Sequence, residues 1–228
     1  MPRFIQPEII RKRLYDVRVI MKDNNVDVYF IMTGDYHMSE YAGDYFAQRE
    51  YMSGFTGSAG TLVITENEVA LFTDGRYFGQ AEAQIKDTGI VLMKMGTAGT
   101  PTLSEYCIQK LPNKGVIGFD GRIVPALDGI ELEKEAKRKG GEVNYSFDPV
   151  ESIWTDRPEF PSSKAYLLDE KYTGQDISEK LKRVRTAMKE AQADVHIISS
   201  LDDICWLFNI RGNDVECNPV IMAYAMIT

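Results

Sequence analysis

The turn after a predicted strand over residues 68–73 places a cation beside a phenol, Arg76 and Tyr77. Open α/β sheets bind ligands beyond the carboxyl ends of their strands, so both side chains are displayed where a ligand would lie. A guanidinium there can donate two hydrogen bonds to a carboxylate, or one to a peptide carbonyl. From spacing alone, a structural ion pair or a solvated arginine is favoured over ligand contact. Asp74 is predicted to cap the helix that follows.

A second candidate is His37, which precedes Glu40 by three residues in a loop after a predicted strand over residues 27–33. A His-x-x-Glu pair can ligate a metal ion from one face of a helix. Two ligands do not make a metal site, and no further cluster with metal-ligand spacing follows. We therefore expect His37 to be a hydrogen-bonded loop histidine. His196 lies in a predicted buried strand and is expected to be a satisfied core histidine.

The remaining polar motifs do not predict catalysis. The glycine-rich stretch 53–60 lacks the Lys-Ser/Thr pair and the helix of a P-loop, and is expected to form a turn that allows close backbone packing. Asp202, Asp203 and Asp214 have no histidine or cation beside them in the sequence, so we expect caps and turns. The sequence has no Gly-x-Ser-x-Gly motif. We predict no catalytic and no metal-binding residue in this chain.

An internal repeat organises the elements that must position these residues. Residues 14–35 and 181–202 match at a constant offset of 167, with nine identities in 22 positions. In each copy, apolar residues spaced by three or four predict a helix, and a following apolar run predicts a buried strand. An aromatic, glycine-containing segment and a further predicted strand come next, at residues 51–57 and 60–65 in one copy and at residues 206–212 and 219–227 in the other.

The first copy continues with predicted strands at residues 68–73, 90–95, 115–119 and 142–147. Predicted helices alternate with them: one begins at residue 74, and two span residues 102–111 and 126–139. This alternation predicts an α/β domain with a mixed or largely parallel sheet flanked by helices. We assign residues 1–150 to a first domain, 151–163 to a connector and 164–228 to the beginning of a second. The second copy is expected to be truncated, which makes the chain part of a longer protein; the alternative is a shorter domain that closes differently.

Charge and composition exclude several classes of partner. The net charge of −8 over 228 residues disfavours a nucleic-acid partner, because an acidic surface repels phosphates. No apolar run reaches the roughly 20 residues that cross a bilayer, and the start lacks a secretory signal, so no membrane partner is expected. The odd set Cys107, Cys205 and Cys217 has no Cys-x-x-Cys spacing, which favours free thiols in the cytoplasm.

Five motifs, in this order, resemble the three-domain Xaa-Pro aminopeptidases, also called aminopeptidase P. They run from Gly34 to Tyr41, Ser53 to Thr61, Thr73 to Phe78, Ile153 to Pro158 and Leu201 to Gly212. The resemblance covers essentially the whole chain. It departs from the larger relatives at Gly79, where leucine often follows the Tyr-Phe pair, so packing there is expected to differ without removing the arginine.

The resemblance implies two creatinase-like N-terminal α/β domains followed by a pita-bread catalytic domain. In that catalytic domain two Asp, one His and two Glu hold two metal ions, usually manganese, which activate water for attack on the bond before a proline in second position. None of these five ligands lies in this chain, so the chain alone is expected to be inactive. The implied partners are a peptide with proline second and, in the full-length protein, a second copy in a homodimer.

The resemblance also implies a role for the first domain, which shapes the mouth of the active site. The arginine of its Thr-Asp-Gly-Arg-Tyr-Phe motif, here Arg76, is associated with peptide binding, and His37 and Tyr77 are weaker candidates. Two alternatives remain. One is a stand-alone peptide- or protein-binding module, as in histone-chaperone subunits of similar fold; the other is a creatinase-type hydrolase that works without metal.

Overall fold

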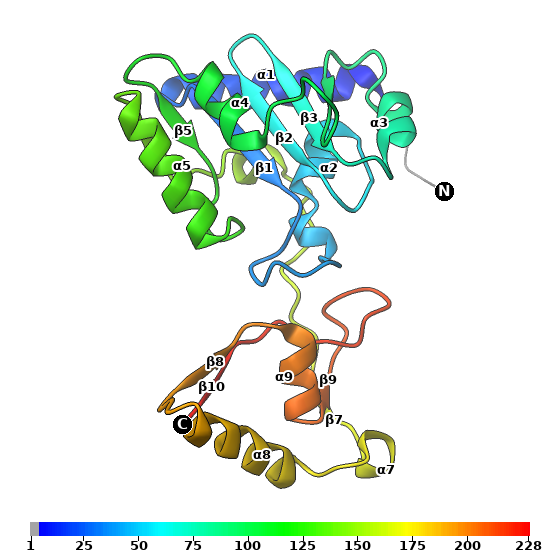
Figure 1. Cartoon of the computed structure of the whole chain (residues 1–228). Coiled ribbons are helices and arrows are strands. Elements are labelled where there is room, and N and C mark those ends of the chain that lie inside the picture. The colour runs from blue at the N-terminus through cyan, green and yellow to red at the C-terminus, as the bar shows by residue number, and fades with distance from the viewer. Residues whose placement is uncertain (1–4) are drawn as a thin grey trace. The chain divides into compact units, whose positions relative to one another are not determined.

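The computed structural model describes residues 5–228, which form two compact units (Figure 1). The first unit comprises residues 5–34 together with Phe46–Arg157, and the second comprises Asp35–Tyr45 and Pro158–Thr228. The change from one unit to the next at Arg157 falls within the predicted connector, 151–163. The loop Asp35–Tyr45, which the sequence-based boundary includes in the first domain, groups with the second unit.

A six-stranded mixed sheet forms the centre of the first unit, in the order β4-β3-β2-β1-β5-β6. Its strands are β1 (Val28–Met32), β2 (Thr61–Thr65), β3 (Val69–Thr73), β4 (Val91–Lys94), β5 (Val116–Gly118) and β6 (Glu142–Asn144). The β1–β2 and β2–β3 pairs are antiparallel, whereas β1–β5, β3–β4 and β5–β6 are parallel. The predicted mixed sheet is confirmed.

Helices cover both faces of this sheet. They are α1 (Pro7–Asp23), α2 (Gln48–Ser53), α3 (Phe78–Gln84), α4 (Leu103–Lys110), α5 (Ala126–Arg138) and α6 (Val150–Ile153). Successive strand side chains point to opposite faces. Tyr29 and Ile31 of β1 therefore pack with the apolar stripe of α1, while Val28 and Phe30 pack with the core residues of α4 and α5.

The second unit contains two small antiparallel sheets. Strand β8 (His196–Ile198) pairs with β10 (Ala225–Ile227), and β7 (Tyr166–Leu167) pairs with β9 (Ile210–Arg211). The helices are α7 (Glu170–Thr173), α8 (Ile177–Glu190) and α9 (Leu201–Leu207). Apolar side chains of α8, α9, β8 and β10 form its main core cluster, which includes Met188, Ile198, Ile204, Leu207 and Ile227.

Several local predictions are wrong. Two unpredicted helices, α2 and α9, end inside the two aromatic segments. The predicted strand over 219–227 is a strand only at Ala225–Ile227. Residues 219–222 instead make hydrogen bonds with the loop at residues 212–214, where the Asp214 carboxylate accepts from the Met222 amide at 2.7 Å. His196 is exposed, since β8 buries only Ile198.

The three cysteines are free thiols, with Cys107 and Cys205 buried and Cys217 exposed. Burial raises the pKa of the Cys107 thiol to about 12. None of the helices within residues 5–228 is long and apolar enough to cross a membrane.

Candidate functional site

The turn that carries Arg76 begins where β3 ends. The Asp74 carboxylate accepts hydrogen bonds from the Arg76 amide at 3.0 Å, from its Nε at 2.9 Å and from its Nη2 at 2.8 Å. The Asp74 carboxylate thus accepts its hydrogen bonds from Arg76 and not from the first turn of the helix that follows. Helix α3 begins only at Phe78, with Tyr77 at its N-cap position and no side-chain cap. The predicted cap by Asp74 is wrong for this reason.

The same pairing fixes the electrostatics of the turn. The hydrogen bonds from the Arg76 side chain, and then from its amide, lower the pKa of Asp74 to about 2. The Arg76 side chain nevertheless remains 66% exposed. A fork-shaped cation is therefore oriented by a carboxylate while much of its surface faces solvent. The structural ion pair predicted for Arg76 from its spacing is therefore present, and this pair leaves the guanidinium accessible.

Tyr77 has a structural role in this turn. Its hydroxyl lies 2.7 Å from the Ser58 hydroxyl, and its ring packs edge-on against the Phe55 ring, with the centroids 6.0 Å apart. A Cβ atom on Gly57 would lie 2.3 Å from the Phe55 ring, and one on Gly60 would lie 2.9 Å from the Phe72 carbonyl oxygen. The glycine-rich stretch is thus a close-packed turn, as predicted. Gly79 has no atom within 4 Å of its Cβ direction, so the turn tolerates its departure from leucine.

Arg49 is a buried cation beneath this turn that the sequence did not single out. It is 6% exposed, its Nη2 donates to the Gly57 carbonyl oxygen, and its guanidinium lies over the Phe55 ring, 4.7 Å from the centroid. Burial lowers the pKa of Arg49 to about 10. The side chain links helix α2 to the glycine-rich turn. Its sequence signal was weak, because α2 itself was not predicted.

His37 belongs to the second unit, in the loop Asp35–Tyr45. This loop is not helical at residues 37–40, so His37 and Glu40 do not share a helix face as a metal-binding pair would require. The His37 ring stacks on the Tyr224 ring, with the centroids 4.2 Å apart. Neither ring nitrogen has a hydrogen-bond partner within the described chain, so the expected hydrogen-bonded side chain is wrong.

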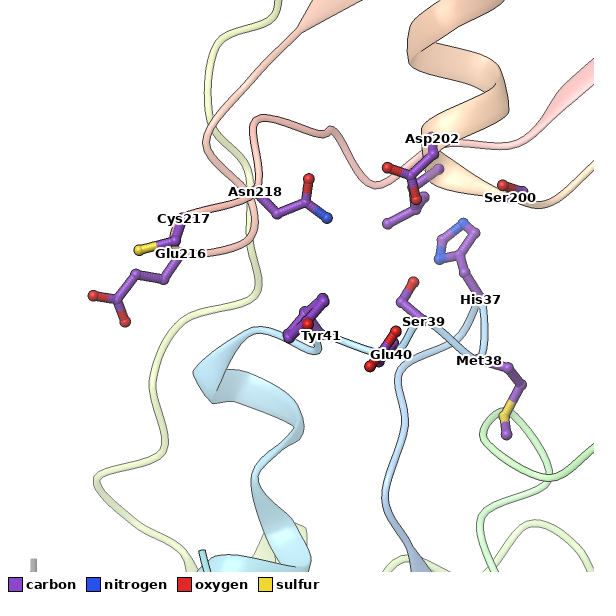
Figure 2. Close-up of a pocket in the computed structure, with 11 residues that line it drawn as sticks. His37, Met38, Ser39, Glu40, Tyr41, Ser200, Asp202, Glu216, Cys217 and Asn218 are labelled. Carbon is purple, nitrogen blue, oxygen red and sulfur yellow. The ribbon is translucent and has the colours of Figure 1, made fainter. Parts of the chain in front are cut away.

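The second unit brings His37 into one cavity with Asp202. The cavity measures about 740 Å³ and is lined by the loop at residues 37–41, by residues 200–202 at the start of α9, and by the turn at residues 216–218 (Figure 2). The N-cap of α9 is Ser200, whose hydroxyl accepts from the Asp203 amide, so Ser200 supplies the cap that was expected from Asp202 or Asp203. Across residues 5–228, no group of three or more His, Cys, Asp or Glu side chains could hold a metal ion.

The six-stranded mixed sheet with helices on both faces defines the first unit as an α/β domain, and the second unit repeats its opening elements. Models of the creatinase/prolidase N-terminal domain match residues 13–151 and, in a second version, residues 156–228. The chain belongs to the creatinase/prolidase N-terminal domain family.

Relatives extend the similarity to almost the whole chain. The probable Xaa-Pro aminopeptidase P of Pyrenophora teres f. teres is 39% identical over 95% of this chain and 33% of its own length. That of Botryotinia fuckeliana is 40% identical over 95% of this chain and 34% of its own length. The X-prolyl aminopeptidase of Caenorhabditis elegans, a cytosolic enzyme with a di-nuclear active site, superposes with a TM-score of 0.89 and 31% identity over 96% of this chain and 37% of that structure. This chain thus spans about a third of these relatives.

Proposed function

We propose that this chain is the N-terminal, non-catalytic region of an Xaa-Pro aminopeptidase, a hydrolase that removes the residue before a proline in second position. The observation that carries this proposal is the match to the Caenorhabditis elegans enzyme over 96% of the chain at a TM-score of 0.89. In this role the region shapes substrate access to a catalytic centre built by other residues and contributes to a homodimer. A stand-alone binding module and a metal-free hydrolase are the alternatives that the test distinguishes.

The proposal assigns the metal chemistry of such an enzyme to residues outside this chain. The described residues contain no set of ligands that could hold a metal ion, so they do not fit the di-nuclear site of the Caenorhabditis elegans relative. Two manganese ions in a separate catalytic domain are part of the proposal. So is a cytoplasmic location, which the cytosolic description of that relative supports.

Within this region, we propose that Arg76 contacts the peptide substrate. Its guanidinium is oriented by Asp74 and remains accessible at the carboxyl end of β3, which is the edge where α/β sheets bind ligands. A guanidinium in this position can donate to peptide carbonyl oxygens or to a terminal carboxylate. Tyr77 and His37 are weaker candidates, since the Tyr77 hydroxyl is engaged by Ser58 and His37 belongs to the other unit.

The proposed function is tested by assaying two proteins on Xaa-Pro peptides, with and without manganese. We expect no hydrolysis by the 228-residue chain and manganese-dependent hydrolysis by the complete product of its gene. A complete product that hydrolyses no Xaa-Pro peptide would overturn the proposal, as would turnover by the purified chain itself. The sequence of the gene beyond Thr228 gives an independent check, because five metal ligands in family order are expected there.

The role of Arg76 is tested in the complete enzyme with Arg76→Ala. We expect the KM for longer peptides to rise while the metal content stays unchanged, because the lost contact lies with the substrate. Gly79→Ala, on an open position of the neighbouring helix, serves as the matched control with unchanged kinetics. Unaltered KM values in Arg76→Ala would assign Arg76 to a structural role alone.

A further inference from the structure

The cavity in the second unit has a polar, acidic lining to which the proposed function assigns no role. Among the residues that line it, Glu40, Asp202 and Glu216 carry carboxylates, and there is no lysine or arginine. Figure 2 shows His37, Ser39 and Asp202 pointing toward a common space, whereas Glu216 and Cys217 point away from it. The chemistry of the cavity is therefore set by the imidazole of His37, the carboxylate of Asp202 and neighbouring hydroxyls.

The His37 side chain in this cavity has unused hydrogen-bonding capacity. Both ring nitrogens are buried, and neither has a hydrogen-bond partner among the described residues. A neutral imidazole has one donor and one acceptor nitrogen, and burying either without a partner costs free energy. A ligand that donates to the acceptor nitrogen from the cavity would recover the part of that free energy that belongs to this nitrogen.

The loop that presents His37 is held in a defined shape. Asp35 is fully buried, and its Oδ1 accepts hydrogen bonds from the His37 amide at 2.8 Å and the Ser39 amide at 2.9 Å. The Tyr224 hydroxyl donates to the Tyr36 carbonyl oxygen at 2.8 Å, and the Tyr224 ring stacks on the imidazole. Because both the loop backbone and the ring are fixed, a ligand would meet a pre-organised histidine.

The acidic lining determines which ligand fits. Asp202 is exposed, and its carboxylate makes no hydrogen bond or ion pair with the rest of the described chain. An ammonium group can donate to a carboxylate and to the acceptor nitrogen of an imidazole at the same time, and hydrogen bonds between ionised partners are the stronger ones. An anion would instead meet carboxylates without a compensating cation.

We propose that this cavity binds a primary ammonium group, with Asp202 as its counter-ion and His37 as its hydrogen-bond acceptor. Two sources carry this chemistry, a small alkylamine and the side chain of a lysine in a polypeptide. The inference concerns binding by residues of the second unit and does not depend on peptide hydrolysis, so its failure would leave the proposed function unaffected.

Nuclear magnetic resonance of the imidazole nitrogens tests the proposal directly. The chain has two histidines, and the exposed His196 is an internal reference. The 15N-labelled chain is titrated at constant pH and ionic strength with n-butylammonium chloride, and separately with n-butanol as the neutral analogue. We expect saturable shifts of the His37 nitrogens with n-butylammonium only, and no matching shift at His196. No saturable shift, or equal shifts with n-butanol, would overturn the proposal.

Two variants and a matched control identify the counter-ion. Asp202→Asn is expected to weaken n-butylammonium binding about tenfold, the loss of one charge-assisted hydrogen bond. Asp203→Asn changes the adjacent acidic residue, which does not line the cavity, and should leave the affinity unchanged. Circular dichroism checks that each variant is folded, and Glu40→Gln gives a second reduction of the negative charge. Unchanged affinity in Asp202→Asn would contradict the assignment, and so would a loss in Glu40→Gln larger than that in Asp202→Asn.

A third titration distinguishes the two sources. N-acetyl-lysine methylamide presents the same ammonium group attached to a peptide backbone. Tighter binding of this compound than of n-butylammonium would support a lysine side chain as the ligand, and weaker binding would support a small amine. Either result requires that the His37 nitrogens respond and that Asp202→Asn reduces the response.

Discussion

Both faces of strand β1 in the first unit are covered by other side chains, whereas only one face of its counterpart β8 in the second unit is covered. Ile31 and Ile198, equivalent at the offset of 167, are both buried at 1% and 8% exposure. Phe30 is 3% exposed, but its equivalent Ile197 is 71% exposed. The two copies therefore share the face that packs against the preceding helix and differ on the opposite face.

The difference comes from elements outside the repeated segment. In the first unit, Phe30 packs with side chains of α4 and α5, which follow the repeat by many residues. In the second unit, Ile197 pairs with Met226 of β10, which is 67% exposed. A strand sequence thus fixes which side chains share a face, and distant segments decide whether that face is buried.

Two basic contacts are retained in both copies. Arg13 donates to the Tyr51 carbonyl oxygen and lies over the Tyr51 ring; the equivalent Lys180 does the same with Trp206. The Nε of Arg18 donates to the Thr65 carbonyl oxygen of β2, and the Nε of its equivalent Arg185 donates to the carbonyl oxygen of Thr228, the residue after β10. The repeat therefore preserves the contacts that connect its first helix to the next elements, not only an apolar pattern.

The largest expected difference between the copies is at the outer strand face. Phe30→Ala should destabilise the first unit by about 3–5 kcal/mol, because it leaves a cavity in a closed core. Ile197→Ala should change the stability of the second unit by no more than about 0.5 kcal/mol, because the side chain is exposed. Native-state hydrogen exchange of the strand amides in each unit measures both. A cost at Ile197 as large as that at Phe30 would show that its face is covered in solution.

A smaller difference is expected at the first basic contact. Lys180 is 1% exposed and also donates to Asn209 Oδ1 at 2.6 Å, so Lys180→Met leaves two acceptors without their donor and should cost about 1–3 kcal/mol. Arg13→Met should cost less, about 0.5–1.5 kcal/mol, because Arg13 is only half-buried. Urea denaturation measures both, with the exposed Lys182→Met as control. Equal costs for the two positions would mean that burial does not distinguish them.

The second basic contact should show a smaller effect again. Arg18→Met removes a half-buried hydrogen bond to β2 and should cost about 1 kcal/mol, whereas Arg185→Met removes an exposed one and should cost about 0.5 kcal/mol or less. Thermal unfolding of the two variants beside the parent chain measures the difference. The idea that both contacts close the same helix–strand unit fails if neither variant changes stability.

The smallest effect is expected at the Asp74–Arg76 turn, which follows a strand, β3, without a counterpart in the described second unit. The folded pKa of Asp74, about 2, is lower than its ordinary value, so the ion pair is complete above about pH 4 and is lost as the pH falls through 2. In Arg76→Gln the pKa of Asp74 should rise toward its ordinary value of about 4. Carboxyl 13C titration measures it, and an unchanged pKa would remove Arg76 as the cause.

The predicted elements that proved correct have a strong local signal. The stripe of α1 repeats every three or four residues, and β1 to β3 are unbroken β-prone apolar runs. Helices α2 and α9 were missed because they are six and seven residues long, too short to show a period. His196 was misplaced because a buried strand and a half-exposed one have the same sequence pattern when the covering helix is distant.

The candidate site divides in the same way. Arg76, Asp74 and Tyr77 are close in sequence, so their turn was predictable although the direction of Asp74 was not. The sequence could not predict that His37 and Asp202 line one cavity, because 165 residues separate them and no local pattern indicates a contact over that separation.

The amino-acid sequence by itself determined the repeat, the mixed α/β class and the motifs by which the chain resembles its family, since these depend on periodicity and on the order of residues. Only the tertiary structure decided which strand faces are buried, which unit the loop of His37 joins, and where Arg49 lies. Burial and long-range proximity depend on segments that meet only after folding, and their free energies arise from those contacts.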